Sequence, residues 1–314
     1  MADFDLTVAG ELNLDLILYG LPDDLEPEKE LLASDLALTL GSSSAIFAHN
    51  LAVIGNRVGF ISRIGTDPLG KISLERLQAG GVDVSRVRAV EGQTKSGLTV
   101  IVTGSTSRRI LTYPGAIFEM GYDDLDIDYL RSAKHFHLAS FYLHRALRPR
   151  IPELFAQMKS AGLSTSLDTN DDPDDTWDGL DDVLPLVDVL FVNEREACKI
   201  ARMDNVEASV EKLAGLAKLV AVKLGRQGAR VRQGRKEWTH PGFTVNAIDP
   251  VGAGDSFDAG FLHKYIRGGN LQECLASGNL AGAFSTTRPG GTEAFREQPK
   301  WQEFLQQHGN EAAA

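Results

Sequence analysis

The chain contains 314 residues, of which 43% are apolar and 24% are charged, the balance of an ordinary folded globular protein. This balance excludes disordered, collagen-like and membrane-spanning classes, and the length allows two average domains or one large α/β core. The 32 basic and 43 acidic side chains give a formal net charge of −11. Because such a surface repels phosphate backbones and anionic lipids, we expect no nucleic-acid partner and no membrane partner.

The two cysteines, Cys198 and Cys274, are too few and too widely spaced for a disulfide framework or a cysteine-based metal site. We expect both to be packed thiols in a reducing compartment. The N-terminal residues lack the basic and apolar regions of a signal peptide. Together these features predict a cytoplasmic protein.

The first third of the chain alternates between strand-like and helix-like patterns. Residues 10–16 alternate apolar and polar side chains as in a half-exposed strand, with Asp15 on the polar face. The elements predicted here are strands over 4–9 and 10–16, a helix over 44–51, a strand over 57–64 and a helix from Pro68.

Two β-type runs, residues 96–103 and 108–113, flank the short polar segment 104–107. A connection this short predicts a β-hairpin, since a crossover between parallel strands needs about a dozen residues or more. The hairpin therefore interrupts the α/β alternation.

Strands and helices alternate again after the hairpin. The predicted strands cover 135–139, 163–168, 187–193 and 219–224, and a short β-meander covers 229–239. The predicted helices cover 151–159, 194–201, 207–216, the segment from the glycine-rich turn to about 267, 271 to about 287, and 299–307.

This order of elements predicts an α/β fold, with a mostly parallel sheet, helices on both faces and extra β-structure inserted between the early units. Ligands in such folds bind beyond the carboxyl ends of the strands. The acidic segment 168–182 is interpreted as a solvated loop.

The most informative segment is 249–257, with the sequence Asp-Pro-Val-Gly-Ala-Gly-Asp-Ser-Phe. Its two glycines lie between a β-run and a helix, where several backbone N–H groups converge into an anion site. Asp255 has two interpretations that this segment leaves open. It caps the helix, or it takes a proton from an incoming hydroxyl while the amides hold a transferred phosphoryl group.

Four familiar patterns are excluded. Residues 65–72 have the glycine and lysine spacing of a Walker A loop, but Ile72 replaces the magnesium-binding hydroxyl and Pro68 removes an amide. The first strand ends at Gly10 without a GxGxxG fingerprint, and the chain has neither a GxSxG elbow nor an HExxH motif.

Four motifs in this order resemble those of the ribokinase-like (PfkB) carbohydrate kinase family, and the similarity covers nearly the whole chain. Residues 249–255 resemble its C-terminal D-T-x-G-A-G-D signature, with Pro250 in place of the threonine. Residues 55–70 resemble its N-terminal signature, which ends in G-x-D-x-x-G. Residues 193–196 match its N-x-x-E motif, and residues 224–228 resemble its L-G-x-x-G turn near the nucleotide.

The resemblance implies a single ribokinase-like kinase domain over residues 1–314. This domain is a three-layer αβα sandwich with a mostly parallel central sheet and a small β-sheet lid, whose segments cover approximately 12–40 and 95–118. The hairpin that interrupts the alternation then belongs to the lid. The implied activity is ATP-dependent phosphorylation of a hydroxyl, with ATP and Mg²⁺ as cofactors.

The resemblance also assigns roles around the phosphates. Asp255 would be the general base, and the amides of Gly252, Ala253 and Gly254 would form the anion hole. Asn193 and Glu196 would organise Mg²⁺ through its water shell; taken alone, they read as a helix N-cap and an exposed first-turn glutamate. The implied ATP-binding residues are Asn193, Lys223, Gly225, Gly228, Gly254 and Asn279.

On the substrate side, Asp15 can accept hydrogen bonds from two adjacent hydroxyls of a sugar. The chain departs from the ribokinase pattern at Ile46, which cannot supply the usual amide, and Asn50 one turn later is a partial substitute. No basic cluster stands beside Asp15, which favours a neutral sugar or a nucleoside over a sugar acid. The implied sugar-contacting residues are Asn13, Asp15, Gly41, Ser42 and Ser43.

Two further sites follow from the family. Arg108 and Arg109, at the turn of the lid, would reach the transferring phosphate on closure, or they are plain surface charges. A monovalent cation, usually potassium, would bind at Asp249, Val251, Ser285, Arg288 and Gly290.

The residues leave three functions open: a sugar kinase acting on a primary hydroxyl, a nucleoside kinase of the same fold, and a non-catalytic sensor of sugar or nucleotide. They do not identify the sugar, the acceptor hydroxyl or the oligomeric state. An exposed edge of the lid sheet would favour a homodimer through the lid.

Overall fold

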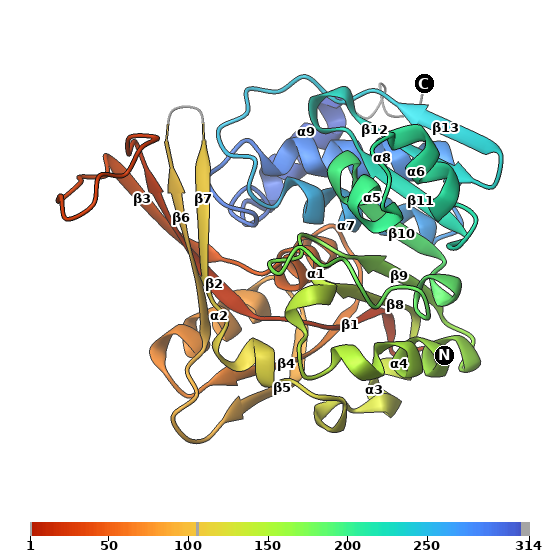
Figure 1. Ribbon diagram of the computed structural model, residues 1–314, viewed down its shortest axis with the longest axis horizontal. Helices are drawn as coiled ribbons and strands as arrows, with labels where there is room; N and C mark the ends of the chain where they lie inside the picture. Colours follow the sequence, from red (N-terminus) through yellow and green to blue (C-terminus); the bar gives the residue numbers. More distant parts are fainter. Residues whose placement is uncertain (1, 105–106, 309–314) are drawn as a thin grey trace.

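The computed structural model describes residues 2–104 and 107–308. The main sheet contains, in the described residues, β1 (Phe4–Ala9), β4 (Val58–Gly65), β5 (Asp83–Val90), β8 (Ala133–Ala139), β9 (Ser164–Asp168), β10 (Val189–Asn193), β11 (Leu219–Lys223), β12 (Ala229–Gln233) and β13 (Lys236–His240). Their order in space is β13-β12-β11-β10-β9-β8-β1-β4-β5 (Figure 1). The strands from β11 to β5 pair in parallel, and β12 and β13 extend one edge in antiparallel fashion.

Helices cover both faces of this sheet. Side chains of β10 alternate between the two layers: Val189 and Phe191 pack under one set of helices, and Leu190 and Val192 under the other. The first layer contains α1 (Ser43–Val53), α2 (Pro68–Ala79), α7 (Ala253–Tyr265) and α8 (Leu271–Ser285). The second contains α3 (Ile127–Arg131), α4 (Ile151–Ser160), α5 (Glu194–Ala201) and α6 (Val206–Leu213), and α9 (Gln298–His308) packs against α8.

A second sheet stands beside the body, at the left of Figure 1. Its strands are β2 (Asn13–Tyr19), β3 (Asp35–Leu40), β6 (Gly97–Thr103) and β7 (Arg108–Tyr113), in the order β3-β2-β6-β7. Ile17 and Ile101 pack from this sheet onto Val251 of the glycine-rich turn. The sheet therefore lies against the loop that begins α7, as a lid would.

The predicted fold class is confirmed: a mostly parallel sheet lies between two helical layers, and a separate small sheet forms the lid. The predicted hairpin is present as the antiparallel pair of β6 and β7, although residues 105 and 106 at its tip lie outside the described residues. The sequence interpretation missed α3 and β5. β5 is an exposed edge strand whose arginines mask the β pattern, as is common on edge strands.

The structure tests the predictions about Asp15, the two cysteines and membrane-spanning segments. Asp15 lies on the face of β2 that packs against the body and is buried, not half exposed. Cys274 is buried, whereas Cys198 is only partly buried, and both thiols are free. Within the described residues, no helix combines the length and apolarity needed to cross a bilayer.

Candidate active site

The glycine-rich turn leads directly into α7. Gly252 occupies the N-cap position with φ +74°, a left-handed conformation that glycine adopts without strain. A Cβ atom at Gly252 would lie 2.5 Å from the Cα atom of Gly291, so glycine is also required by the close approach of these two loops. The turn therefore brings bare backbone to the start of a helix.

The amides of this turn differ in their availability. The Ala253 amide donates to the carbonyl of Pro250 at 3.2 Å. The amides of Gly254 and Asp255 lie in the first turn of α7, where an α-helix offers no carbonyl partner. With the positive end of the helix dipole, these amides suit an anion such as a phosphoryl group.

Asp255 follows at the third residue of α7 and is buried. Within the described residues it makes no hydrogen bond to a helix-start amide, so it does not cap α7. Burial and the nearby Asp168 together raise the pKa of Asp255 to about 7, although Lys223 and Ser43 act to lower it. A carboxyl group that titrates near neutral pH beside an anion site is suited to accept a hydroxyl proton.

A buried charge cluster lies under Asp255. Lys223 Nζ lies 2.6 Å from Asp168 Oδ2 and 3.5 Å from Asp258 Oδ2. Burial raises the pKa of Asp258 well above its usual value, and its carboxyl group hydrogen-bonds to Asp168. Although burial opposes it, the Lys223 ammonium lowers the pKa of Asp168 below its usual value. The two carboxyl groups beside this one lysine therefore have pKa values that are shifted in opposite directions, upward for Asp258 and downward for Asp168.

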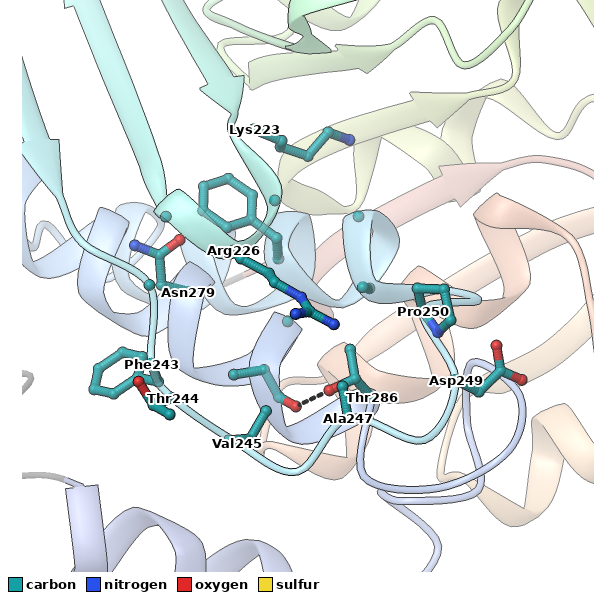
Figure 2. Close-up of a pocket in the computed structure, with 18 of the residues that line it drawn as sticks. Lys223, Arg226, Phe243, Thr244, Val245, Ala247, Asp249, Pro250, Asn279 and Thr286 are labelled. Carbon is teal, nitrogen blue, oxygen red and sulfur yellow. Dashed lines mark hydrogen bonds between the residues drawn. The ribbon is translucent and has the colours of Figure 1, made fainter. Parts of the chain in front are cut away.

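A cleft of about 650 Å³ lies between the ends of β11 and β12, α7 and α8 (Figure 2). It brings together Lys223, Gly225, Gly228, Gly254 and Asn279, which are five of the six residues assigned to ATP binding. The remaining one, Asn193, does not line this cleft. The sequence interpretation missed Thr286 and the loop that forms another wall, which includes Phe243, Thr244, Val245 and Ala247. Arg226, which lies within the predicted segment 223–228, also lines the cleft.

Asn279 shapes this cleft by hydrogen-bonding to the backbone of a neighbouring segment. Its Nδ2 atom donates to the carbonyls of His240 and Pro241 at 3.0 and 3.2 Å. These bonds fix the chain just before the wall that begins at Phe243. The local sequence gives no sign of this role, since the partners lie about forty residues away.

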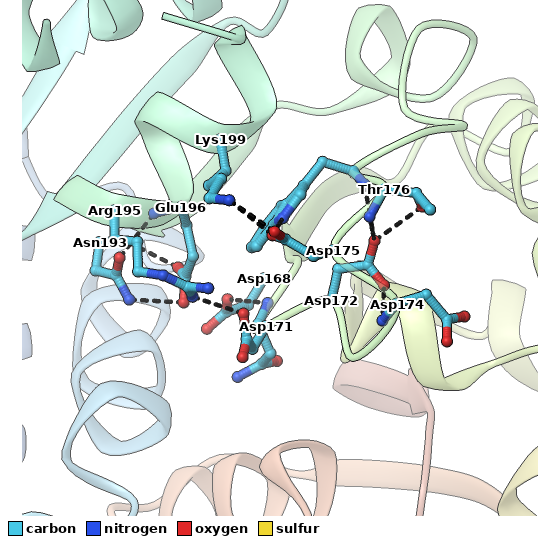
Figure 3. Close-up of polar contacts among 12 residues, drawn as sticks. Asp168, Asp171, Asp172, Asp174, Asp175, Thr176, Asn193, Arg195, Glu196 and Lys199 are labelled. Carbon is cyan, nitrogen blue, oxygen red and sulfur yellow. Dashed lines mark hydrogen bonds and ion pairs between the residues drawn. The ribbon is translucent and has the colours of Figure 1, made fainter. Parts of the chain in front are cut away.

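Asn193 and Glu196 form a reciprocal cap at the start of α5 (Figure 3). The Asn193 side chain accepts from the Glu196 amide at 2.9 Å, and Glu196 accepts from the Asn193 amide at 2.8 Å. Glu196 is buried, however, so the interpretation as an exposed first-turn glutamate is wrong. Burial and the nearby Asp168 raise its pKa to about 6.

The acidic loop after β9 packs alongside α5 (Figure 3). Asp171 and Asp175 pair with Arg195 and Lys199 at 2.6 and 2.8 Å, and these partners are largely exposed. Asp172 is buried instead and accepts hydrogen bonds from three backbone amides of its own loop. The interpretation as a solvated loop therefore holds for the exposed carboxylates, but not for Asp172 or for Asp168.

The proposed sugar side is built on β2. Gly41 is required there, because a Cβ atom would lie 2.0 Å from Asp15 Oδ1. Asn13 donates to Thr99 Oγ1 at 3.0 Å and accepts from Ser42, so its amide is held within the lid. Burial raises the pKa of Asp15 to about 7, with further contributions from the Asp255 and Asp249 carboxylates.

The departure at Ile46 has a structural explanation. Its side chain packs against the backbone of Gly252 and Gly291 and fills the gap between their loops. Asn50 is fully buried and its Nδ2 atom donates to Ser256 Oγ and the carbonyl of Gly291, both at 2.9 Å. Asn50 therefore supports α7 and does not substitute as a sugar ligand.

Asp249 connects the lid to the glycine-rich turn. Its Oδ1 atom accepts from the Val251 amide at 2.9 Å, and its Oδ2 atom accepts from the Gly290 amide at 2.9 Å and from Tyr19 Oη at 2.8 Å. Tyr19 comes from the lid strand β2 and has no motif around it. Ser285 ends α8, and the chain continues through Arg288 to Gly290.

The alternation of β7 separates the two lid arginines. Arg108 on β7 pairs with Thr103 on β6, and Thr103 pairs with Tyr19 on β2. Because paired residues of neighbouring strands point to the same face of a sheet, Arg108 shares the face of the lid that meets the body. Arg109 lies on the other face and donates to the carbonyl of Asp23 at 3.0 Å. Both arginines are exposed.

The glycine-rich segment that imitates a Walker A loop is a helix cap. Asp67 Oδ1 accepts from the amides of Leu69 and Gly70 at 2.9 and 3.2 Å. These are amides that a phosphate-binding loop would offer to its ligand. The exclusion of a P-loop is therefore supported by the fold.

Comparisons with known proteins agree with this geometry. Residues 3–298 match the family described as pfkB family carbohydrate kinase. An ATP-dependent ribose-1-phosphate kinase of Halopiger xanaduensis is 31% identical over 289 residues, 91% of this chain and 93% of that protein.

Two solved structures share the fold. A ribokinase-like protein of E. coli in complex with ATP and Mg²⁺ has a TM-score of 0.83 at 22% identity, covering 97% of this chain and 99% of that one. The ribokinase of Arabidopsis thaliana complexed with ribose and ATP has a TM-score of 0.82 at 24% identity, with the same two coverages.

Proposed function

Because the chain belongs to the PfkB family of carbohydrate kinases, which are ATP-dependent phosphotransferases, we propose that it transfers the γ-phosphoryl group of ATP to a primary hydroxyl of a neutral sugar or sugar-like molecule. Asp255 is the proposed general base. The observation that carries this assignment is a buried carboxyl group with a pKa of about 7 at the start of α7, between the large cleft and the lid.

The proposed reaction uses groups already in place. The acceptor hydroxyl gives its proton to Asp255 while its oxygen bonds to the γ-phosphorus, and the bond from that phosphorus to the leaving ADP oxygen breaks. The first-turn amides of α7 hold the charge on the transferred group, with Arg108 facing the same side from the lid. Ile17 and Ile101 keep water away from the turn, which favours transfer over ATP hydrolysis.

Magnesium fits the end of β10. The buried Glu196 and the neighbouring Asp168 bring two carboxyl groups together there, and burial and Asp168 raise the pKa of Glu196 to about 6 although Lys223 lowers it. We assign Asn193 and Glu196 to a water-bridged Mg²⁺. When bound, this ion would stabilise the charge on the phosphate oxygens.

The proposed acceptor site contains Asn13, Asp15, Gly41 and Ser42. Asp15 lies close enough to Asp255 for that carboxyl group to raise its pKa. A polyol can therefore donate hydrogen bonds to the Asp15 carboxylate from one hydroxyl and lose a proton to Asp255 from another. Among the described residues, no cation pairs with Asp15. This environment supports a neutral acceptor.

Potassium is proposed beside this site. Asp249 supplies a carboxylate, and the carbonyls at the C-terminal end of α8 carry the negative end of a helix dipole near Ser285. The backbone of Val251, Arg288 and Gly290 completes the proposed ligand set.

The function is tested by measuring ADP release over a panel of neutral sugars, sugar phosphates, nucleosides and sugar acids, each with potassium and with sodium. We expect neutral sugars to give the fastest release and potassium to raise it. The best substrate being a nucleoside would reassign the acceptor class. Ligand binding without ADP release from any member would identify a non-catalytic sensor.

We also propose that the chain acts in the cytoplasm as one kinase domain with lid segments 12–40 and 95–118. The low cysteine content supports this location. Every residue of β7, at the edge of the lid sheet, is exposed, including Leu111 at 58% and Tyr113 at 53%. An apolar edge of this kind supports pairing with a second copy.

Light scattering tests the proposed dimer. We expect the wild-type chain to have the mass of a dimer and Leu111→Lys to have the mass of a monomer, because a charge would be placed on the apolar lid surface. Leu216→Lys is the matched control, since Leu216 is an exposed leucine outside the lid and should leave the mass unchanged. A monomeric wild type at micromolar concentration would contradict the proposal.

A further inference from the structure

Helix α1 begins without a cap of its own. Ser42 occupies its N-cap position, but within the described residues its side chain makes no hydrogen bond to an amide of the helix. Its φ of +68° also departs from the extended backbone that a capping serine normally has. The first turn of α1 contains no acidic residue that would complement the helix dipole. The positive end of this helix, beside the proposed acceptor site, therefore requires a partner from elsewhere.

Glu11 is that partner. It lies between β1 and β2 and is 2% exposed. Its Oε1 atom accepts from the Ser44 amide at 3.2 Å, which is the bond that an N-cap side chain makes to the second residue of a helix. Its Oε2 atom accepts from Ser44 Oγ at 2.6 Å. The carboxylate thus caps α1 from a separate segment, 33 positions away in the chain.

The Glu11 carboxylate is ionised although it is buried. Ser140 Oγ donates to its Oε1 atom at 2.7 Å, and His144 Nε2 lies 3.4 Å from its Oε2 atom. Burial raises the pKa of Glu11, but His144, Ser44 and Ser140 together lower it below its usual value. A negative charge therefore stands at the positive end of α1, where it stabilises the start of the helix.

A cap from outside the helix leaves the Ser42 hydroxyl free for another bond. Ser42 Oγ donates to Oδ1 of Asn13, and Nδ2 of Asn13 donates to Thr99 Oγ1 at 3.0 Å. Both ends of the Asn13 amide are thereby fixed, on the face of β2 that also carries Asp15. If the Ser42 hydroxyl capped α1, as a serine at this position usually does, Asn13 would lose one of the two contacts that set its orientation.

A second chain of hydrogen bonds returns from Glu11 to α1. The Ser140 amide donates to Oδ1 of Asn170 at 2.9 Å, and Nδ2 of Asn170 donates to Ser43 Oγ at 3.0 Å. Ser140 and Asn170 have φ values of +54° and +52°, left-handed conformations that are uncommon outside glycine. Because Ser140 Oγ is anchored to Glu11, the same carboxylate also holds the segment that contacts the first residue of α1. The start of α1 is therefore fixed to Glu11 by two routes.

From these contacts we propose that Glu11 is a positioning residue for the acceptor site: its carboxylate caps α1 in place of Ser42, so that the Ser42 hydroxyl is available to orient the Asn13 amide. This inference rests on the proposed acceptor site and adds to it the residue that holds two of its members in place. Glu11 is buried and both of its oxygens are occupied, so it acts through the start of α1 and does not touch the substrate.

The first test measures the cap itself, by NMR-detected hydrogen exchange in the full chain without ligand. Glu11→Met fills the same space but removes both acceptor oxygens. We expect the Ser44 amide to exchange about tenfold faster in this variant, because a side-chain cap protects the first turn of a helix by an amount of this order. Glu11→Gln keeps one acceptor oxygen and should accelerate the same amide by a smaller factor.

The second test asks whether the cap acts on the acceptor site. For the member of the panel that binds best, Glu11→Met should raise the calorimetric Kd and the KM about tenfold, whereas the Kd for ATP and kcat should change less than about twofold. Ser42→Ala removes the hydroxyl through which the cap is proposed to act and should cause a similar rise. The double variant should bind little more weakly than the weaker single variant, because the two residues act through one amide.

Asn205→Ala is the matched control for damage to the start of a helix. Asn205 caps α6 by accepting from the Ala208 amide at 2.9 Å, and α6 belongs to the helical layer on the other face of the main sheet. This variant should accelerate exchange at Ala208 and leave the acceptor Kd unchanged. A rise in the acceptor Kd as large as that of Glu11→Met would reflect a general loss of stability and would overturn the inference.

The inference and the proposed function fail in different ways. Weaker acceptor binding by Glu11→Met, in a chain that releases no ADP, would uphold the inference and contradict the kinase proposal. An active kinase whose acceptor affinity is the same in Glu11→Met and the wild type would do the reverse. An unchanged exchange rate at Ser44 would overturn the inference alone, and a wild-type chain that binds no member of the panel would overturn both.

Discussion

Replacing Asp255 with asparagine should lower kcat by about two to four orders of magnitude, the range expected when a general base is lost. Asparagine keeps the size of the side chain and accepts a hydrogen bond, but it cannot take a proton. Affinity for ATP should change little, because the cleft is lined by other groups. Initial-rate kinetics and calorimetric ATP titration measure the two quantities.

The same substitution should increase stability at alkaline pH. Asp255 has a pKa of about 7 in the folded chain, against an ordinary value of 3.8 for an aspartate in water, so its ionisation disfavours the folded state. This cost is absent below about pH 4 and is fully developed above pH 7. Asp255→Asn removes it, and we expect a free energy of unfolding about 2–4 kcal/mol higher than that of the wild type at pH 8, with little difference at pH 4.

Asp188→Asn is the matched control, because the same substitution at this position should change the free energy of unfolding in the opposite direction. Asp188 lies 2.6 Å from Lys159. Although burial raises the pKa of Asp188, the hydrogen bonds from Lys159 and from the Thr165 amide lower it below its usual value. Its ionisation therefore favours folding, and the variant should lose stability at pH 8 while kcat stays near the wild-type value. A chain with Asp255→Asn that retains most of its turnover would remove Asp255 from the mechanism.

The parts of the site that local sequence predicts are those that backbone geometry encodes. The turn around Gly252 and the cap formed by Asn193 and Glu196 each depend on residues within a few positions of one another. Their motifs can therefore be recognised in the sequence. The alternation of strands and helices likewise predicts the layered fold, because burial on two faces of a parallel sheet leaves long apolar runs.

The parts that were missed depend on contacts between distant segments. Tyr19 meets Asp249 across 230 positions, and Lys223 meets Asp168 across 55. Nothing in the residues around Tyr19 indicates its partner. Asp168 did carry a usable signal, since it ends a buried strand at the edge of the sheet where ligands bind, but the aspartates after it masked this position.

Replacing Lys223 with methionine should lower the free energy of unfolding by about 3–5 kcal/mol at pH 8, the usual cost of leaving one partner of a buried ion pair uncompensated. Lys223 and Asp168 have side chains that are 15% and 1% exposed, so water cannot replace the lost ammonium at Asp168. Urea denaturation followed by circular dichroism measures the loss. Because Lys223 also lowers the pKa of Asp255, the acidic limb of kcat/KM should move to higher pH in this variant.

Lys159→Met provides the control, because Lys159 lies at the same 2.6 Å from Asp188 but the two side chains are 36% and 9% exposed. Solvent screening and the second lysine near Asp188 should limit this loss to about 1 kcal/mol or less.

The loss of unfolding free energy in Lys223→Met should also shrink as the pH falls from 8 to 5. Without the ammonium, the folded-state pKa of Asp168 rises above its unfolded value, so the penalty is full above that raised pKa and disappears as Asp168 takes up a proton. Equal losses in the two lysine variants at pH 8 would mean that water reaches the cluster and that the charges around Asp255 are screened.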